Sequence, residues 1–136
     1  KSIYSGECDV AIINHYYYGK LTYSKNPDHR KWAKASIIVF PNQGSSDRGA
    51  HVNISGGGVV KFSKNKESAT KFLEFLVTDE AQVLYGDVNF EYPINNKSKL
   101  PKRLKALGTF KEDSLLIEDI AKLAPKAQEI IDTVYW

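Results

Sequence analysis

Three apolar runs in the first half of the chain have the pattern of β-strands. Asp9–Asn14 (DVAIIN) and Ala35–Gln43 (ASIIVFPNQ) are apolar stretches bounded by polar residues, which is typical of buried strands. The third, His51–Lys64, is rich in β-branched residues but contains three successive glycines, Gly56–Gly58. Glycines inside a strand indicate a bend, a bulge or a crossing between lobes. A phosphate-binding loop is the alternative, but it would need the glycines to open a helix, and two valines continue the extended pattern instead.

From Asn65 onward the apolar spacing changes to that of helices. Asn65 is predicted to cap a helix whose apolar residues recur at intervals of three and four. Asp79 is predicted to cap a second helical piece, Asp113 to cap a third, and Pro125 to lie in the first turn of a last helix. The stretch Leu21–Lys34 is predicted to be a loop, because it contains the turn sequence Asn-Pro-Asp. Strands followed by helices predict an α/β protein.

The composition is that of one globular domain. The chain has 136 residues, of which 42% are apolar, and a formal net charge of +3. A small basic cluster is interpreted as a solvated face, and nucleic acid is not a predicted partner. Its members are Lys97, Lys99, Lys102, Arg103 and Lys105. No run of eighteen apolar residues is present, so no membrane span is predicted.

Cys8 is the single cysteine of the chain, which excludes an internal disulfide and a zinc site built on cysteines. We expect it to be a buried, unpaired thiol that is dispensable, with a catalytic nucleophile as the alternative. The chain contains no methionine and opens within a pattern that reads as the end of a helix running into a strand. We therefore expect residue 1 not to be the native start and the chain to be a piece of a longer protein.

Three successive tyrosines, Tyr16–Tyr18, follow the first predicted strand after one residue, His15. Alternate residues of a strand face opposite sides, so adjacent phenols share a site only if the strand ends first. The strand must then end near Asn14 or His15, and Gly19 would permit the chain to turn. Ligands of open α/β sheets bind at this end of the strands. Half-buried packing is the alternative role for each tyrosine, and a platform for stacking sugars is another.

Two adjacent phenols are suited to ferric iron. A free phenol has a pKa near ~10 and is a weak ligand, but a strongly charged cation favours the phenolate. Phenolate is a hard, anionic oxygen donor with precedent on iron. Two phenolates would cancel two of the three charges of the ion. Zinc and copper prefer imidazole and thiolate ligands, so the same pair suits them poorly.

Several segments resemble, in the same order, the C-terminal part of the periplasmic ferric-iron-binding proteins of bacterial ABC importers. They are GECDVAIINHYYYGK, FPNQGSSDRGAHVNISGGGVVKFSKNKESATKFLEFLVTDEAQ, NFEYPIN and FKEDSLLIEDIAKLAPKAQEIIDTVYW. The resemblance implies an α/β, two-lobed periplasmic solute-binding fold of type II, present here as a C-terminal part. It also implies that the protein is not an enzyme. It would hold Fe3+ in the interlobe cleft and deliver it to the ABC importer permease in the inner membrane.

The same resemblance implies the roles of individual residues. Tyr16 and Tyr17 would be the metal ligands, and Tyr18 would be packing. Asn14 corresponds to a position that helps to hold a synergistic anion such as carbonate, and Lys20 stands where many relatives carry an arginine. Further ligands would come from the missing N-terminal part of the same protein, and none of the three histidines (His15, His29 and His51) is expected to bind iron.

The resemblance also predicts how segments divide between the two lobes. Residues 1–54 would belong to the lobe that carries the tyrosines, residues 55–106 to the other lobe, and residues 107–136 would return to the first. A solute-binding protein of the same fold for a polyamine, thiamine or a phosphonate is the alternative. It would need carboxylates or anion-binding amides in place of phenolates. An enzyme that uses Cys8 or a histidine is the third hypothesis.

Overall fold

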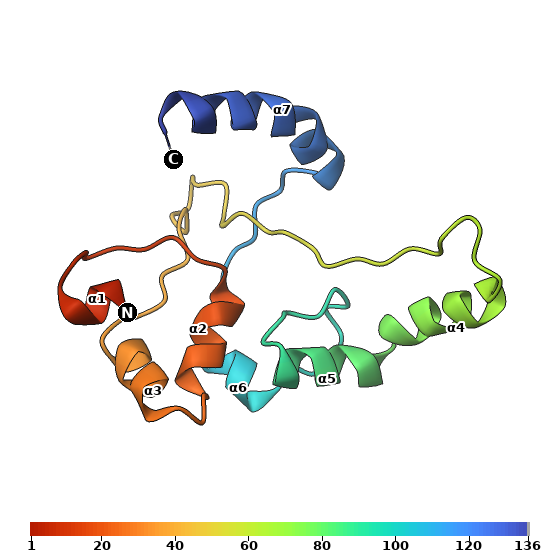
Figure 1. The fold of residues 1–136 in the computed structure, drawn as a ribbon, viewed down its shortest axis with the longest axis horizontal. Helices are drawn as coiled ribbons and strands as arrows, with labels where there is room; N and C mark the ends of the chain where they lie inside the picture. Colours follow the sequence, from red (N-terminus) through yellow and green to blue (C-terminus); the bar gives the residue numbers. More distant parts are fainter. Residues whose placement is uncertain (136) are drawn as a thin grey trace. The chain divides into compact units, whose positions relative to one another are not determined.

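The computed structural model describes residues 1–135, among which it contains seven α-helices and no β-strand (Figure 1). A single isolated parallel bridge joins Ala50 and Glu112. The helices are α1 (Ser2–Ser5), α2 (His15–Thr22), α3 (Pro27–Lys34), α4 (Lys66–Leu76), α5 (Asp79–Val88), α6 (Lys102–Lys105) and α7 (Ile117–Thr133). None of the helices within residues 1–135 is long and apolar enough to cross a membrane.

The three predicted strands are not formed. A strand is defined by its hydrogen bonds to another strand, and residues 9–14, 35–43 and 51–64 make no such ladder in the described chain. None of their residues is buried: Val10 is 81% exposed and Ile37 82%, whereas Ile38 and Phe40 are half-buried. The prediction of strands is therefore wrong for these residues, because the pairing that would make strands of the apolar pattern is absent from them.

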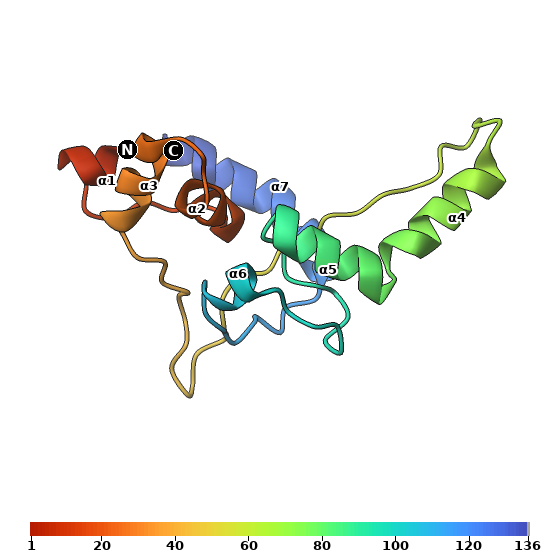
Figure 2. The same cartoon turned by 90° about the horizontal axis from the view of Figure 1, so that it is seen from below.

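The chain forms two compact units. The first combines Lys1–Val39 with Gly56–Thr109 and contains α1 to α6; the second combines Phe40–Ser55 with the chain from Phe110 onward and contains α7 (Figures 1 and 2). A boundary between the units falls at Gly56, the first of the three glycines. The predicted assignment of segments to the lobes of a solute-binding fold groups the chain differently, and it stays a prediction.

Helices α2 and α3 form where a strand end and a loop were predicted. The side chain of Asn26 accepts a hydrogen bond of 2.9 Å from the backbone N–H of Asp28, and Pro27 is the first helical residue. Asn-Pro-Asp is therefore a helix start rather than a turn, since proline at this position costs no hydrogen bond. The two helices lie side by side.

Two further helix starts follow Asn65 and Thr78. Helix α4 begins directly after Asn65 as predicted, although the asparagine side chain makes no capping bond. Helix α5 is capped by Thr78, whose hydroxyl accepts from the N–H of Ala81, and not by Asp79 as predicted. The carboxylate of Asp79 instead accepts a 2.6 Å hydrogen bond from the hydroxyl of Ser98. The cap therefore lies one residue earlier than the pattern indicated.

The core of the first unit is built on the buried side chains of Phe90, Leu104 and Leu107. Gly19 belongs to α2 and faces this core: a Cβ added there would lie 2.5 Å from Cγ of Phe90. The prediction that Gly19 permits a turn is wrong, because the residue is helical. It is needed there for the close approach of an aromatic ring. Four half-buried side chains complete the cluster: Tyr16, Tyr18, Tyr92 and Leu100.

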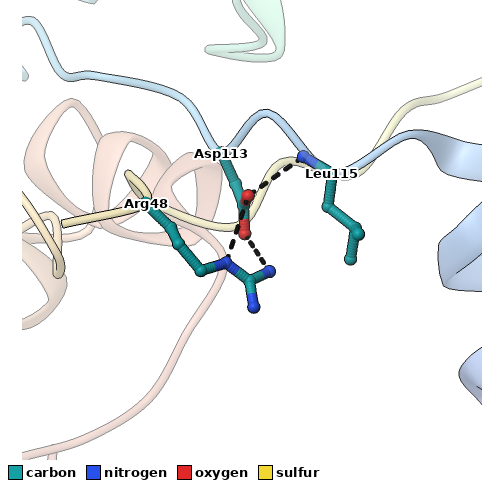
Figure 3. A network of polar contacts seen from close by, with 3 residues as sticks. All are labelled: Arg48, Asp113 and Leu115. Carbon is teal, nitrogen blue, oxygen red and sulfur yellow. Dashed lines mark hydrogen bonds and ion pairs between the residues drawn. The ribbon is translucent and has the colours of Figure 1, made fainter.

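In the second unit, Asp113 does not cap a helix as predicted. Its carboxylate accepts hydrogen bonds from the Arg48 guanidinium, with a 2.6 Å ion pair to Nη2, and from the N–H of Leu115 (Figure 3). The hydrogen bond from Arg48 is the largest of the effects that lower the pKa of Asp113. Helix α7 begins later, at Ile117, and Pro125 lies inside it rather than starting a separate helix.

We expect Gly19→Ala to lower the free energy of unfolding of the full-length protein by about 1–3 kcal/mol, the usual cost of overpacking. Alanine is the better helix former by about 1 kcal/mol, so a net loss would identify the contact with Phe90 as its cause. Denaturant unfolding measures the difference. The control is Gly56→Ala, where nothing lies within 4 Å of the added Cβ. Equal stability of the two variants would contradict the prediction.

Candidate metal-binding site

The first turn of α2 carries the tyrosines. Asn14 precedes the helix in an extended conformation, with φ −70° and ψ 136°, and the helix begins at His15. The chain therefore changes from extended to helical backbone at the position where adjacent phenols require it to change. Tyr16 and Tyr17 are the second and third residues of the helix, and Lys20 lies one turn later.

The rings of Tyr16 and Tyr17 lie against each other. Their centroids are 4.4 Å apart and the ring planes are inclined at 45°. Tyr16 is half-buried against the core, whereas Tyr17 is 52% exposed. The amide of Asn14 donates to the hydroxyl of Tyr16 over 3.3 Å. Two phenol oxygens and one amide thus gather at the start of one helix.

The hydroxyl group of Tyr16 influences the ionisation of the Tyr17 phenol. Hydrogen bonding to Tyr16, followed by the charge of Tyr16, raises the pKa of the Tyr17 phenol above its ordinary value, while the charge of Lys20 acts in the opposite direction. The Tyr17 phenol of the metal-free protein is therefore harder to ionise than an ordinary phenol. A cation held between the two oxygens would reverse this preference.

The surroundings supply positive charge. The first turn of α2 contains no acidic side chain, so the partial positive charge at its N-terminus is not compensated by one. The ammonium of Lys20 lies 5.2 Å from the centroid of the Tyr16 ring. Both features favour anionic oxygen at this position, whether it belongs to a phenolate or to a small anion.

Tyr18 differs from its two neighbours. Its hydroxyl donates to the backbone oxygen of Ser36 over 3.1 Å, and its ring packs against the core of the first unit. These contacts link α2 to the end of α3 and leave the hydroxyl occupied. They agree with the packing role expected for Tyr18.

The histidines and the cysteine are placed elsewhere or are already engaged. Nε2 of His15 lies 2.6 Å from the carbonyl oxygen of Phe90. Nδ1 of His29 lies 3.0 Å from the hydroxyl of Ser24, and His51 is exposed. Cys8 is a free thiol as predicted, but it is half-buried rather than buried. Within residues 1–135 no three His, Cys, Asp or Glu side chains form a group that could hold a metal ion.

Sequence reasoning missed the contact of His15 with Phe90. The two residues are 75 positions apart, and no local pattern connects them. Burial lowers the pKa of His15, and its bond to a carbonyl oxygen, which can only accept, requires Nε2 to carry a proton. The histidine that precedes the tyrosine pair is thus held as a hydrogen-bond donor.

The sequence profile described as bacterial extracellular solute-binding protein matches residues 1–83. The chain belongs to this family. It is 38% identical, over its whole length, to "Iron uptake protein A1" of Synechocystis sp., of which it covers 37%. It is 35% identical over 95 residues, 70% of the chain, to the "Major ferric iron-binding protein" of Neisseria meningitidis serogroup B, covering 27% of that relative.

A solved structure is also similar over the entire chain. A Trichodesmium protein in complex with iron and citrate superposes with a TM-score of 0.90 and 42% identity, covering 100% of this chain and 42% of that one. The likeness confirms the predicted fold class, the α/β solute-binding fold of type II. The chain spans about two fifths of the length of this protein and of the Synechocystis relative.

We expect Tyr16→Phe to lower the pKa of Tyr17 and Lys20→Gln to raise it. Removing the Tyr16 hydroxyl removes the hydrogen bond and the charge that raise the pKa of Tyr17. Removing the lysine removes the positive charge that lowers this pKa. The measurement is a pH titration of the iron-free protein followed by nuclear magnetic resonance of labelled tyrosine rings. Tyr18→Phe is the matched control and should leave the Tyr17 titration unchanged. A Tyr17 pKa that does not respond to the Tyr16 change would show that the hydroxyls lie apart.

Proposed function

We propose that the chain is part of a periplasmic protein that binds ferric iron through the phenolates of Tyr16 and Tyr17. The bound Fe3+ would then be delivered to the permease of an ABC importer in the inner membrane. The observation that carries the proposal is the gathering of two adjacent phenols at the positive end of α2. Support also comes from the relatives, one of which is named a ferric iron-binding protein and another of which was solved with iron and citrate.

The charges at the site favour this ion. Two phenolates would compensate two of the three charges of Fe3+, and the N-terminus of α2 would in turn stabilise the phenolates. A remaining coordination position suits a small oxygen anion such as carbonate. Asn14 and Lys20, which both contact Tyr16, are the residues we propose to hold that anion.

Two ligands do not complete a coordination sphere. The chain covers about two fifths of the similar solved protein, so we propose that the other donors come from the N-terminal part of the same protein. Those donors would also close the cleft that excludes water. Metal affinity then depends on the complete protein, because chelate geometry is set by all ligands together.

The same fold could instead bind a polyamine, thiamine or a phosphonate. A polyamine requires carboxylates, but the first turn of α2 has none. A phosphonate would suit the end of the helix, yet it would not require two phenols side by side. An enzyme that uses Cys8 or a histidine stays the third hypothesis. Colour separates these hypotheses, since ferric phenolate absorbs visible light.

In the full-length protein loaded with ferric iron, Tyr16→Phe and Tyr17→Phe should each bleach the visible band. Each change removes a ligand, so the loss of affinity should exceed the roughly 10–100-fold expected for residues that only support ligands. Tyr18→Phe is the matched control and should keep the colour, because its hydroxyl bonds to backbone. The measurement is the absorbance spectrum of the three variants at equal iron concentration.

The result also fixes the register of the pair. Bleaching by Tyr18→Phe together with a normal spectrum for Tyr16→Phe would shift the ligand pair by one residue. A spectrum unchanged in all three variants would mean that the phenols are packing, and the iron proposal would fail.

Cys8→Ser should leave iron binding by the full-length protein within a few-fold of the unaltered protein. The thiol is unpaired and only half-buried, and no metal-binding cluster of the described residues 1–135 includes it. Iron titration of the two proteins measures the effect. Complete loss of function on this change would favour the enzyme hypothesis.

A further inference from the structure

One face of α2 rests on a single residue. His15 and Gly19 are four positions apart, and Tyr23, the residue after the helix, is four positions further on, so the three lie along one side of the helix. Each of them contacts Phe90. The carbonyl oxygen of Phe90 bonds to His15, and its ring fills the space above Gly19 and stacks on Tyr23, with a centroid distance of 5.5 Å and an angle of 13°.

The backbone of Phe90 is strained where it makes these contacts. Its φ is 63°, a left-handed conformation that a bulky side chain rarely adopts. Such a residue persists only when its surroundings hold it firmly, and strain of this kind clusters at functional sites. Phe90 is 4% exposed and packs with Leu104 and Leu107. The strained backbone thus presents a carbonyl to the first turn of α2 and a ring to the next turn.

His15 connects this support to the tyrosine pair. Its ring lies edge-on to Tyr16, with centroids 6.0 Å apart and planes at 77°, and it also packs against Tyr92 at 5.1 Å. The hydroxyl of Tyr92 donates to the carbonyl oxygen of Gly108 over 2.7 Å. His15 is therefore enclosed between two aromatic rings while its Nε2 is tied to Phe90.

We propose that Phe90 and His15 form a clamp that fixes the rotation of α2 and so directs Tyr16 and Tyr17 toward one metal ion. This inference rests on the proposed function, and it makes His15 a positioning residue rather than a ligand. An eight-residue helix is not stable by itself in water, so its orientation must come from tertiary contacts. Two adjacent phenols reach one ion only in a narrow range of helix rotations.

The test compares His15→Ala with His15→Gln in the full-length protein. His15→Ala should shift or weaken the visible ferric-phenolate band and speed the release of iron to excess citrate by about 10–100-fold. His15→Gln should largely restore the visible band and the slow release of iron, because the amide N–H of glutamine can donate to the Phe90 carbonyl oxygen. The matched control is His29→Ala, another half-buried histidine packed on an aromatic ring, which should behave as the unaltered protein.

A second readout does not depend on iron. Amide hydrogen exchange in α2 of the iron-free protein should be faster in His15→Ala than in His29→Ala. A His15→Ala variant with normal band, iron release and exchange would overturn the clamp. A His15→Gln variant that bleaches as completely as Tyr16→Phe would also overturn it, since His15 would then be a ligand. If the unaltered protein shows no visible band, the proposed function fails, and the exchange result alone decides whether the clamp exists.

Discussion

The contact between Phe90 and Gly19 determines where the tyrosine pair lies. Helix α2 is too short to be stable alone, and the apolar segment that precedes it has no strand partner among residues 1–135. Its orientation therefore depends on the core that it meets. Gly19 lets the ring of Phe90 approach the helix backbone. The carbonyl oxygen of Phe90 also holds His15, which lies one turn before Gly19. The first turn, which carries the phenols, is thereby attached to a part of the chain 75 positions away.

Local signals predicted helices better than strands. The change of period at Asn65 located α4, because a helix forms its hydrogen bonds within its own sequence. Strands depend on partners, so the apolar pattern of residues 9–14 and 35–43 was not sufficient to produce them. The predicted caps at Asp79 and Asp113 were wrong for a related reason: both carboxylates bond to residues distant in sequence, Ser98 and Arg48.

In the candidate site, too, features set by neighbouring residues could be predicted, and features set by contacts with distant residues could not. The adjacency of Tyr16 and Tyr17, and the need for the chain to change conformation just before them, could be read from the sequence, and the helix does begin at His15. The role of Gly19 could not, because a glycine that permits a turn and a glycine that accommodates a ring look alike in sequence. The clamp residue Phe90 was beyond prediction, since nothing near it in the chain indicates a left-handed backbone in a bulky residue.

The electrostatics of the pair explain why adjacent phenols would be retained at a helix start. Packing alone does not favour them: the Tyr17 ring is half exposed, and the neighbouring Tyr16 raises the pKa of the Tyr17 phenol. The positive end of α2 and the ammonium of Lys20 both attract negative charge, yet the first turn offers no carboxylate. In the absence of a cation, the Tyr17 phenol therefore resists ionisation beside a helix end whose positive charge is uncompensated. A trivalent cation would overcome the resistance to ionisation and would also balance the helix end, because it would stabilise the phenolates and their negative charge would then compensate the positive end of the helix.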